Sequence, residues 1–167
     1  MIRGLRSSCA CLVMGFLVPY AAHVSRAQAI TEIIDNIGDG AGNTLDNPRG
    51  IVADGSGNVY VTGFGTDNVF KIAPGGTITE IIDSSGDGAG NTLDMPYGIA
   101  VDGSGNVYVA GYNTDNAFKI EPGGAITEII DSSGDGTGNT LDTAYDIAVD
   151  GSVMSTLRVA SATMRSK

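Results

Sequence analysis

Short runs in which apolar and polar residues alternate recur along most of this chain, and turn residues separate them. In "GIAVD" (98–102) Ile99 and Val101 share one face, and "VYVAG" (107–111), "AFKI" (117–120) and "AITEIID" (125–131) continue that alternation. Alternation with a period of two, interrupted by Gly, Asn, Asp and Pro, is typical of β-strands joined by tight turns. No segment keeps helical periodicity over three turns, so the pattern predicts an all-β fold of antiparallel strands.

The four strands belong to a unit of 48 residues that recurs along the chain. The first unit covers residues 30–77, the second 78–125, and a partial third 126–152. The first two units agree at 36 of 48 positions, and the third agrees with the second at 23 of 27. A period of this length indicates a solenoid, a propeller or an array. Four antiparallel strands per unit is the number that one propeller blade contains.

The unit resembles the NHL repeat. The stretch "SGDGAGNTLDMPYGIAVDGSGNVYVAGYNTDNAFKI" contains the Pro-x-Gly-Ile-Ala-Val-Asp strand and the following Gly-Asn-Val-Tyr-Val-Ala of that family, and "NVYVTGF" (58–64) is similar to the related seven-bladed propeller repeat. The chain departs from the family in the third strand, where Lys71 and Lys119 are displaced by one position from the usual arginine. The resemblance implies a partial β-propeller with about two complete four-stranded blades. The expected pieces are a lone fourth strand at 30–35, blades at 50–83 and 98–131, and a lone first strand at 146–150.

The first 29 residues read as a secretory signal peptide. Arg3 and Arg6 precede the apolar core "CACLVMGFLVPYAA", and "AQA" at 27–29 is a small-x-small cleavage site. The apolar run is interrupted by Pro19 and is shorter than the ~20 residues of a spanning helix. We therefore expect a signal-peptide helix, cleavage after Ala29, and a product that is secreted, periplasmic or at the cell surface, with no membrane attachment.

Cleavage would change the chemistry available to the chain. Both cysteines and the only histidine, His23, lie in the signal peptide, so the remaining chain has no thiol, disulfide or imidazole chemistry. It keeps six basic and nineteen acidic residues, a net charge of −13. Such a surface repels nucleic acid and anionic membrane, and it suits cations or basic partners. The expected partner is a protein or a carbohydrate, with self-association through open blade faces as a further interaction.

The last fifteen residues, 153–167, differ in character from the repeats before them. They contain three basic residues and no acid, glycine or aromatic residue. Restoring one base to a back-translation of this tail recovers "GNVYVAG" and "DNAFK", so that twelve of the fifteen residues expected from the second unit reappear. We therefore interpret 153–167 as a blade that is read out of frame and the chain as a truncated copy. Arg158, Arg165 and Lys167 are accordingly not expected to form a binding patch.

Two acidic loops have oxygen-bearing residues at spacings similar to an EF-hand calcium loop. The candidate calcium ligands are Asp83, Ser85, Asp87, Asn91 and Asp94 in the first loop, and Asp131, Asp135, Asn139 and Asp142 in the second. The first repeat has Ile37 at the position of Ser85, and no helices are expected on either side of the loops. The alternative is that aspartate and glycine serve here only as turn residues.

The sequence favours a non-catalytic function. The leading interpretation is a secreted propeller-type repeat protein that acts as a binding or scaffolding surface; the alternatives are a fragment of a propeller lyase or lactonase-type hydrolase and a calcium-stabilised surface array. Lyases similar to streptogramin lyase would rely on a histidine, and a catalytic site needs different residues in converging roles. Nearly identical repeats present the same side chains instead, so no catalytic residue and no cofactor other than calcium is expected. Tyr60, Tyr108 and Glu121 are interpreted as packing and turn residues.

Overall fold

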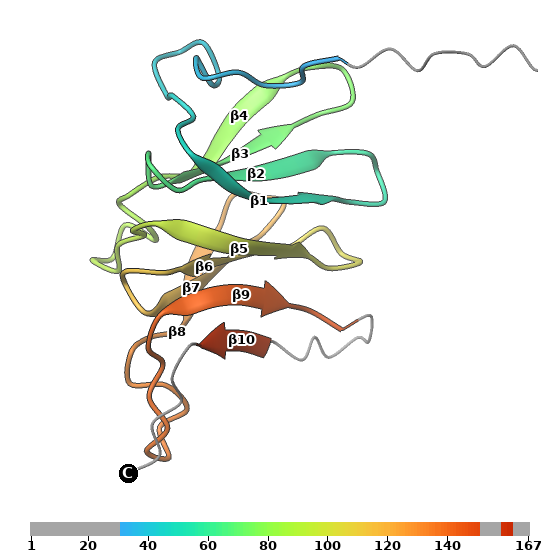
Figure 1. Cartoon of the computed structure of the whole chain (residues 1–167). Coiled ribbons are helices and arrows are strands. Elements are labelled where there is room, and N and C mark those ends of the chain that lie inside the picture. The colour runs from blue at the N-terminus through green and yellow to red at the C-terminus, as the bar shows by residue number, and fades with distance from the viewer. Residues whose placement is uncertain (1–30, 151–157, 162–167) are drawn as a thin grey trace, which may run out of the picture. The chain divides into compact units, whose positions relative to one another are not determined.

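The computed structural model describes residues 31–150 and the backbone of residues 158–161. The signal peptide assigned to 1–29 and the remainder of the tail lie outside the described residues. The described part of the chain forms ten β-strands and no helix, and within it no helix is available to cross a membrane. The predicted all-β fold is thus confirmed (Figure 1).

The strands form two complete blades and a third, shorter sheet. The first sheet consists of β1 (Pro48–Ala53), β2 (Val59–Gly63), β3 (Asn68–Ile72) and β4 (Ile78–Ile82). The second consists of β5 (Pro96–Val101), β6 (Val107–Gly111), β7 (Asn116–Ile120) and β8 (Ile126–Ile130). The third pairs β9 (Ala144–Ala148) with β10 (Arg158–Ser161). Within each four-stranded sheet the strands are antiparallel and follow chain order, as in a propeller blade.

The strand predicted at 30–35 is wrong for its described part. Residues 31–35 form no strand, and a turn follows in which the backbone N–H of Gly38 donates to the carbonyl oxygen of Asp35 over 3.2 Å. In the complete blades, the fourth strand pairs with the third strand immediately before it in the chain. Within the described part of the chain no strand pairs with residues 31–35, so this segment forms no ladder there.

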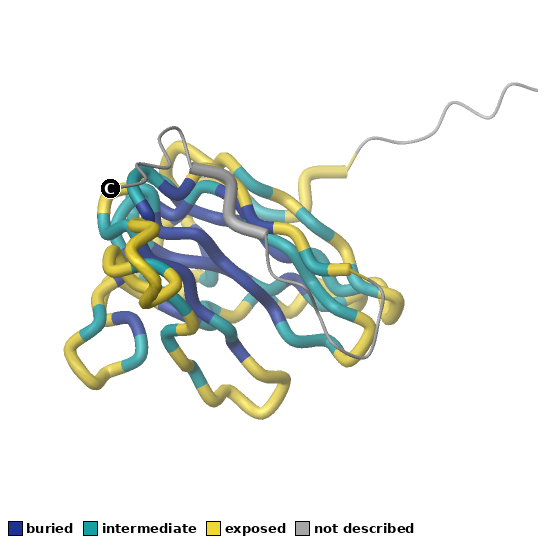
Figure 2. Tube along the Cα trace, turned by 90° about the horizontal axis from the view of Figure 1, so that it is seen from below, coloured by how far each residue is buried: buried dark blue, intermediate teal, exposed yellow. Residues whose placement is uncertain are grey.

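A hydrophobic core joins the first blade to the second. The buried residues that share it are Tyr60, Val69 and Ile82 from the first blade with Leu93, Val107, Val109, Phe118 and Ile120 from the second. Burial is concentrated in the strands, while the connecting loops are largely exposed (Figure 2). Phe118 is fully buried, and burial of such a side chain stabilises a fold by about 1.5–3 kcal/mol. The apolar face of one repeat therefore serves as the packing partner of the next.

The first strands of the blades, β1, β5 and β9, lie side by side (Figure 1). Glycine allows this close approach, because a Cβ atom on Gly50 would lie 2.5 Å from the carbonyl oxygen of Tyr97, and one on Gly98 would lie 2.5 Å from the Cα of Asp146. Both distances are shorter than a real Cβ contact allows. The repeat period thus brings equivalent residues of successive blades next to each other.

The first blade has an apolar residue exposed where the later repeats are covered. Ile51, Ile99 and Ile147 occupy equivalent positions, and the last two pack against the preceding blade. Ile147 is 3% exposed, whereas Ile51 is 67% exposed. The described chain places no blade in front of β1, so the face that carries Ile51 remains open.

The strand β10 pairs with β9 in a register that differs from the repeat. Ile51 and Ile99 lie opposite Val61 and Val109, each ten residues further along the chain. Ile147 lies opposite Val159, twelve residues further along. The tail thus supplies backbone for one strand, displaced by two residues from the position that a true second strand would take.

Candidate functional site

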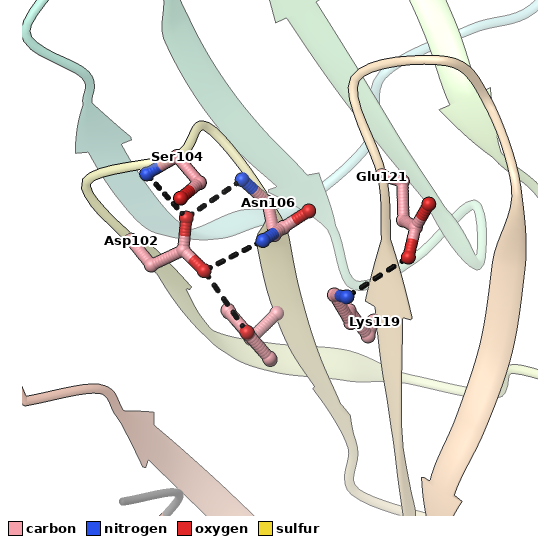
Figure 3. Close-up of polar contacts among 6 residues, drawn as sticks. Asp102, Ser104, Asn106, Lys119 and Glu121 are labelled. Carbon is pink, nitrogen blue, oxygen red and sulfur yellow. Dashed lines mark hydrogen bonds and ion pairs between the residues drawn. The ribbon is translucent and has the colours of Figure 1, made fainter. Parts of the chain in front are cut away.

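A polar turn built on one aspartate closes the hairpin between β5 and β6 (Figure 3). The carboxylate of Asp102 accepts hydrogen bonds from the backbone N–H groups of Ser104 and Asn106, at 2.8 and 2.9 Å. Its second oxygen accepts from the side-chain amide of Asn106 at 2.7 Å and from the hydroxyl of Tyr108 at 3.1 Å. The donors all come from the same hairpin, so this aspartate shapes the turn.

The same turn occurs in the first blade, around Asp54. In both turns the hydrogen bonds shift the pKa of the aspartate. The side-chain amide of Asn58 lowers the pKa of Asp54 below its usual value. Burial acts to raise the pKa of Asp102, but the hydrogen bonds from Asn106 and its neighbours outweigh it and the pKa is lowered. Burial, helped by the hydrogen bond to Asp54, raises the pKa of Tyr60 to about 12. The lowered pKa of the two carboxylates and the raised pKa of Tyr60 keep these groups in their usual charge states near neutral pH.

Lys119 and Glu121 lie near this turn and form an ion pair (Figure 3). The ammonium nitrogen of Lys119 is 2.9 Å from a carboxylate oxygen of Glu121, and both side chains are partly exposed to solvent. Exposed ion pairs of this kind contribute about 0–1 kcal/mol to stability. The pair lies at the end of β7 and the start of the turn after it.

The first acidic loop directs its carboxylates toward its own backbone. Asp83 accepts hydrogen bonds from the backbone N–H and the hydroxyl of Ser85, at 2.8 and 2.5 Å. Asp87 accepts from the N–H of Ala89 at 2.8 Å and from the backbone and side-chain amides of Asn91 at 3.4 and 2.7 Å. These contacts are the Asx-type turns that aspartate commonly forms in loops.

The last candidate ligand of the first loop, Asp94, accepts a hydrogen bond of 2.5 Å from the side-chain amide of Asn113. In the second loop, hydrogen bonds connect Asp131 to Ser133 and Asp135 to Thr137 and Asn139. Asp142 is half-buried at the end of that loop. Among residues 31–150, no group of three or more His, Cys, Asp or Glu side chains is placed to hold a metal ion. Calcium binding by these loops stays a prediction.

A row of aromatic side chains lies at the opposite end of the first strands from the aspartate turns. Tyr97 and Tyr145 are the second residues of β5 and β9, and Phe64 and Tyr112 directly follow β2 and β6. We call Phe64, Tyr97, Tyr112 and Tyr145 the aromatic row. The ring centroids are 6.0 Å apart for Phe64 and Tyr97, 6.4 Å for Tyr97 and Tyr112, and 4.8 Å for Tyr112 and Tyr145. Phe64 and Tyr112 are also 6.3 Å apart and Tyr97 and Tyr145 are 5.5 Å apart, so the row is a staggered group of contacting rings that spans both blades and β9.

Arg49 joins the first-blade end of the aromatic row. It is the second residue of β1 and thus the equivalent of Tyr97 and Tyr145. Its guanidinium carbon lies 5.1 Å from the ring centroid of Phe64 and 5.7 Å from that of Tyr97, within the range of a cation–π interaction. Arg49 and Tyr145 are exposed, and the other three rings are half-buried. The row is an accessible surface of aromatic groups and one cation.

Carboxylates line the loops that lead into this surface. The carbonyl oxygen of Asp46 accepts a hydrogen bond from the N–H of Gly65, next to Phe64 in the chain. Asp94 holds Asn113, next to Tyr112. Aromatic rings flanked by carboxylates and an amide can stack on a ligand and hydrogen-bond to it.

Sequence reasoning did not find the aromatic row. Its signal was present in the repeat, because Arg49, Tyr97 and Tyr145 are separated by 48 residues and so are Phe64 and Tyr112. In one strand, each of these residues looks like an ordinary packing residue. Their clustering depends on β1, β5 and β9 being neighbours, which only the arrangement of the blades determines.

Two stretches of the chain, residues 37–71 and 88–118, match the family model described as "SBBP: Beta-propeller repeat". The expected propeller relationship is confirmed at this level, and the matched family model is not the NHL repeat. No curated protein matches the sequence.

Solved structures with a similar fold include virginiamycin B lyase from Staphylococcus aureus. A catalytically inactive variant with quinupristin matches with a TM-score of 0.50 and 19% identity over 68% of this chain and 34% of that one. A selenomethionine-substituted form matches with a TM-score of 0.50 and 16% identity over 68% and 41%. A streptogramin B lyase matches with a TM-score of 0.44 and 20% identity over 59% and 29%. The chain spans about a third of the length of these lyases, and the first two likenesses concern the fold alone.

Proposed function

We propose that this chain is a non-catalytic binding protein of the propeller-repeat type, and that its ligand contacts the aromatic row. The observation that carries the proposal is the continuous group of four half-buried or exposed rings, in contact with one another across successive blades. Partly exposed aromatic side chains bury a large area in a complex at little entropic cost, which explains their enrichment at binding sites.

The experiment is a binding screen of the full chain on glycan and peptide arrays, repeated with two pairs of substitutions. Tyr97→Leu with Tyr112→Leu removes two rings of the aromatic row, and Tyr60→Phe with Tyr108→Phe changes two tyrosines at the other end of the blades. We expect the ligands bound by the wild type to be lost in the first double variant and retained in the second. Equal binding by all three proteins, each checked for β-sheet content, would show that the aromatic row is not the site.

The alternative function is that of a fragment of a propeller lyase or lactonase-type hydrolase. The likeness to virginiamycin B lyase concerns the fold, and the aromatic row contains no pair of acid and base groups in converging roles. We therefore expect no turnover of streptogramins or lactones by the chain. Turnover above the rate of a buffer blank would favour the lyase or hydrolase alternative.

We also propose the finer assignments that the sequence suggests, namely a secreted bacterial protein of NHL type whose residues 153–167 are read out of frame. The two-residue displacement of β10 relative to the repeat supports the last of these, because a strand read in frame would be expected to keep the register of β2 and β6. Sequencing of the gene beyond the codon for Lys167 tests the frame. Intact-mass measurement of exported protein tests cleavage after Ala29.

Self-association through the open face of the first blade is a second proposal, and the exposure of Ile51 favours it. The equivalent faces are covered by the preceding blade where one is present. Ile51→Ser should leave the fold intact and shift the chain toward monomer in sedimentation velocity. A wild-type chain that is already monomeric at high micromolar concentration would contradict the proposal.

A further inference from the structure

We propose that the aromatic row binds the cationic side chains of a basic, extended protein segment. This inference rests on the proposed binding function and names the chemistry of the partner. Three features of the surface support it. One guanidinium, that of Arg49, already lies against rings of the row; the rings further along have no basic side chain of residues 31–150 beside them; and the loops around the row carry carboxylates.

The first feature is the position of Arg49. Its guanidinium lies against Phe64 and Tyr97, at 5.1 and 5.7 Å from the two ring centroids. Arginine is the side chain that most often occupies such positions, because its flat, weakly hydrated cation is attracted by the negative face of an aromatic ring. The chain thus contains one example of the contact that it would make with a partner.

The second feature is that the end of the row away from Arg49 has aromatic rings but, among the described side chains, no basic one. In the second and third repeats, the position of Arg49 is taken by Tyr97 and Tyr145, whose ring centroids are 5.5 Å apart. Tyr112 contacts both, with centroids at 6.4 and 4.8 Å. Within residues 31–150 the remaining bases are Lys71 and Lys119, which lie near Tyr60 and Glu121 at the other end of the blades. The rings beyond Tyr97 therefore have no base of the described chain to pair with.

The shape of the row also favours a cationic chain over a flat sugar. The rings of Phe64 and Tyr97 meet at 89°, and those of Tyr112 and Tyr145 at 59°. In edge-on and tilted contacts, a neighbouring ring covers part of the ring face. This reduces the flat area available for stacking on a sugar ring. A cation needs less ring area than a stacked sugar ring.

The third feature is the charge around the row. Residues 31–150 contain nineteen acidic and three basic residues, so the surface attracts cations and repels anions. Asp46 and Asp94 precede the first-strand residues of the row and are exposed or half-buried. A basic side chain that stacks on a ring of the row therefore has carboxylates on the neighbouring loops, and its binding should weaken as salt screens them.

The experiment measures the affinity of the full chain for a fluorescent peptide in which arginine alternates with serine. The comparison peptide has citrulline in place of arginine, which keeps the shape of the side chain and removes its charge. We expect the arginine peptide to bind at least tenfold more tightly than the citrulline peptide and to weaken with added salt. Tyr112→Leu should reduce its affinity by about threefold to tenfold, the effect of one cation–π contact, whereas Tyr112→Phe should retain it and Tyr108→Phe should have no effect.

The outcomes separate this inference from the function on which it rests. Equal affinity for the arginine and citrulline peptides, or an arginine affinity unchanged by Tyr112→Leu, would overturn the cationic partner. If the chain instead binds a neutral oligosaccharide and loses it in Tyr112→Leu, the row is a binding site and the partner class proposed here is wrong. If neither kind of ligand binds, the proposed function fails as well.

Discussion

The carboxylate of Asp67 accepts a hydrogen bond of 2.8 Å from the backbone N–H of Met95, and this contact ties the turn after β2 in the first blade to the start of the second. Asp115 holds Thr143 in the same way at 2.6 Å. Met95 and Thr143 have φ angles of 52° and 53°, values that residues other than glycine seldom adopt. The aspartate of one blade thus helps to fix a strained backbone position in the next.

Replacement of Asp67 by alanine should destabilise the packing between the blades. The substitution leaves the N–H of Met95 without this acceptor, and loss of a hydrogen bond to a charged group costs about 1–3 kcal/mol. We expect a lower melting temperature for Asp67→Ala and a smaller decrease for Asp67→Asn, which keeps an acceptor oxygen. A melting temperature equal to that of the wild type in both variants would show that the contact does not stabilise the fold.

The close approach of the first strands predicts a difference between two glycines. A methyl group at Gly98 would meet the backbone of Asp146, whereas one at Gly75 meets nothing within 4 Å. Gly98→Ala should therefore lower the unfolding free energy by about 1–3 kcal/mol, as overpacking does, and Gly75→Ala should change it by less than ~0.5 kcal/mol. Chemical denaturation measures both, and similar effects for the two variants would contradict the packing of β5 against β9.

The stability of the aspartate turns should depend on pH. Hydrogen bonds outweigh burial and hold the pKa of Asp102 below its ordinary value, so the stabilisation from its charged form is present above the unfolded pKa and is lost as pH falls through the folded pKa. Asp102→Asn should lower the melting temperature at pH 7, and the difference from the wild type should shrink as the pH is lowered below about 4. A difference that stays constant down to pH 2 would show that charge is not involved.

The fold was largely predictable from the sequence, because alternation and turn residues specify each blade locally. The turn around Asp102 and the strand β5 follow from "GIAVDGSGN" alone. The predicted strand at 30–35 failed for residues 31–35 because a strand also needs a neighbour, which the local pattern does not contain. The aromatic row and the contact between Asp67 and Met95 join residues of different blades, so they required the packing of whole repeats.

The acidic loops allow a direct comparison of calcium binding with turn formation. The oxygens of Asp87 are occupied by N–H groups of its own loop, so we expect Asp87→Ala to lower the melting temperature by the same amount with millimolar calcium and with a chelator. If the loop instead binds calcium as its spacing suggests, calcium will raise the melting temperature of the wild type and not that of the variant. The wild type with and without magnesium serves as the control for a general effect of divalent ions.

The most direct measurement is an NMR titration of the full chain, labelled in its tyrosine rings, with the tightest ligand that the arrays return. We expect the signals of Tyr97, Tyr112 and Tyr145 to shift on binding, while those of Tyr60 and Tyr108, at the other end of the blades, do not. Shifts confined to Tyr60 and Tyr108, or binding that moves none of the five signals, would contradict the claim that the aromatic row is the binding site.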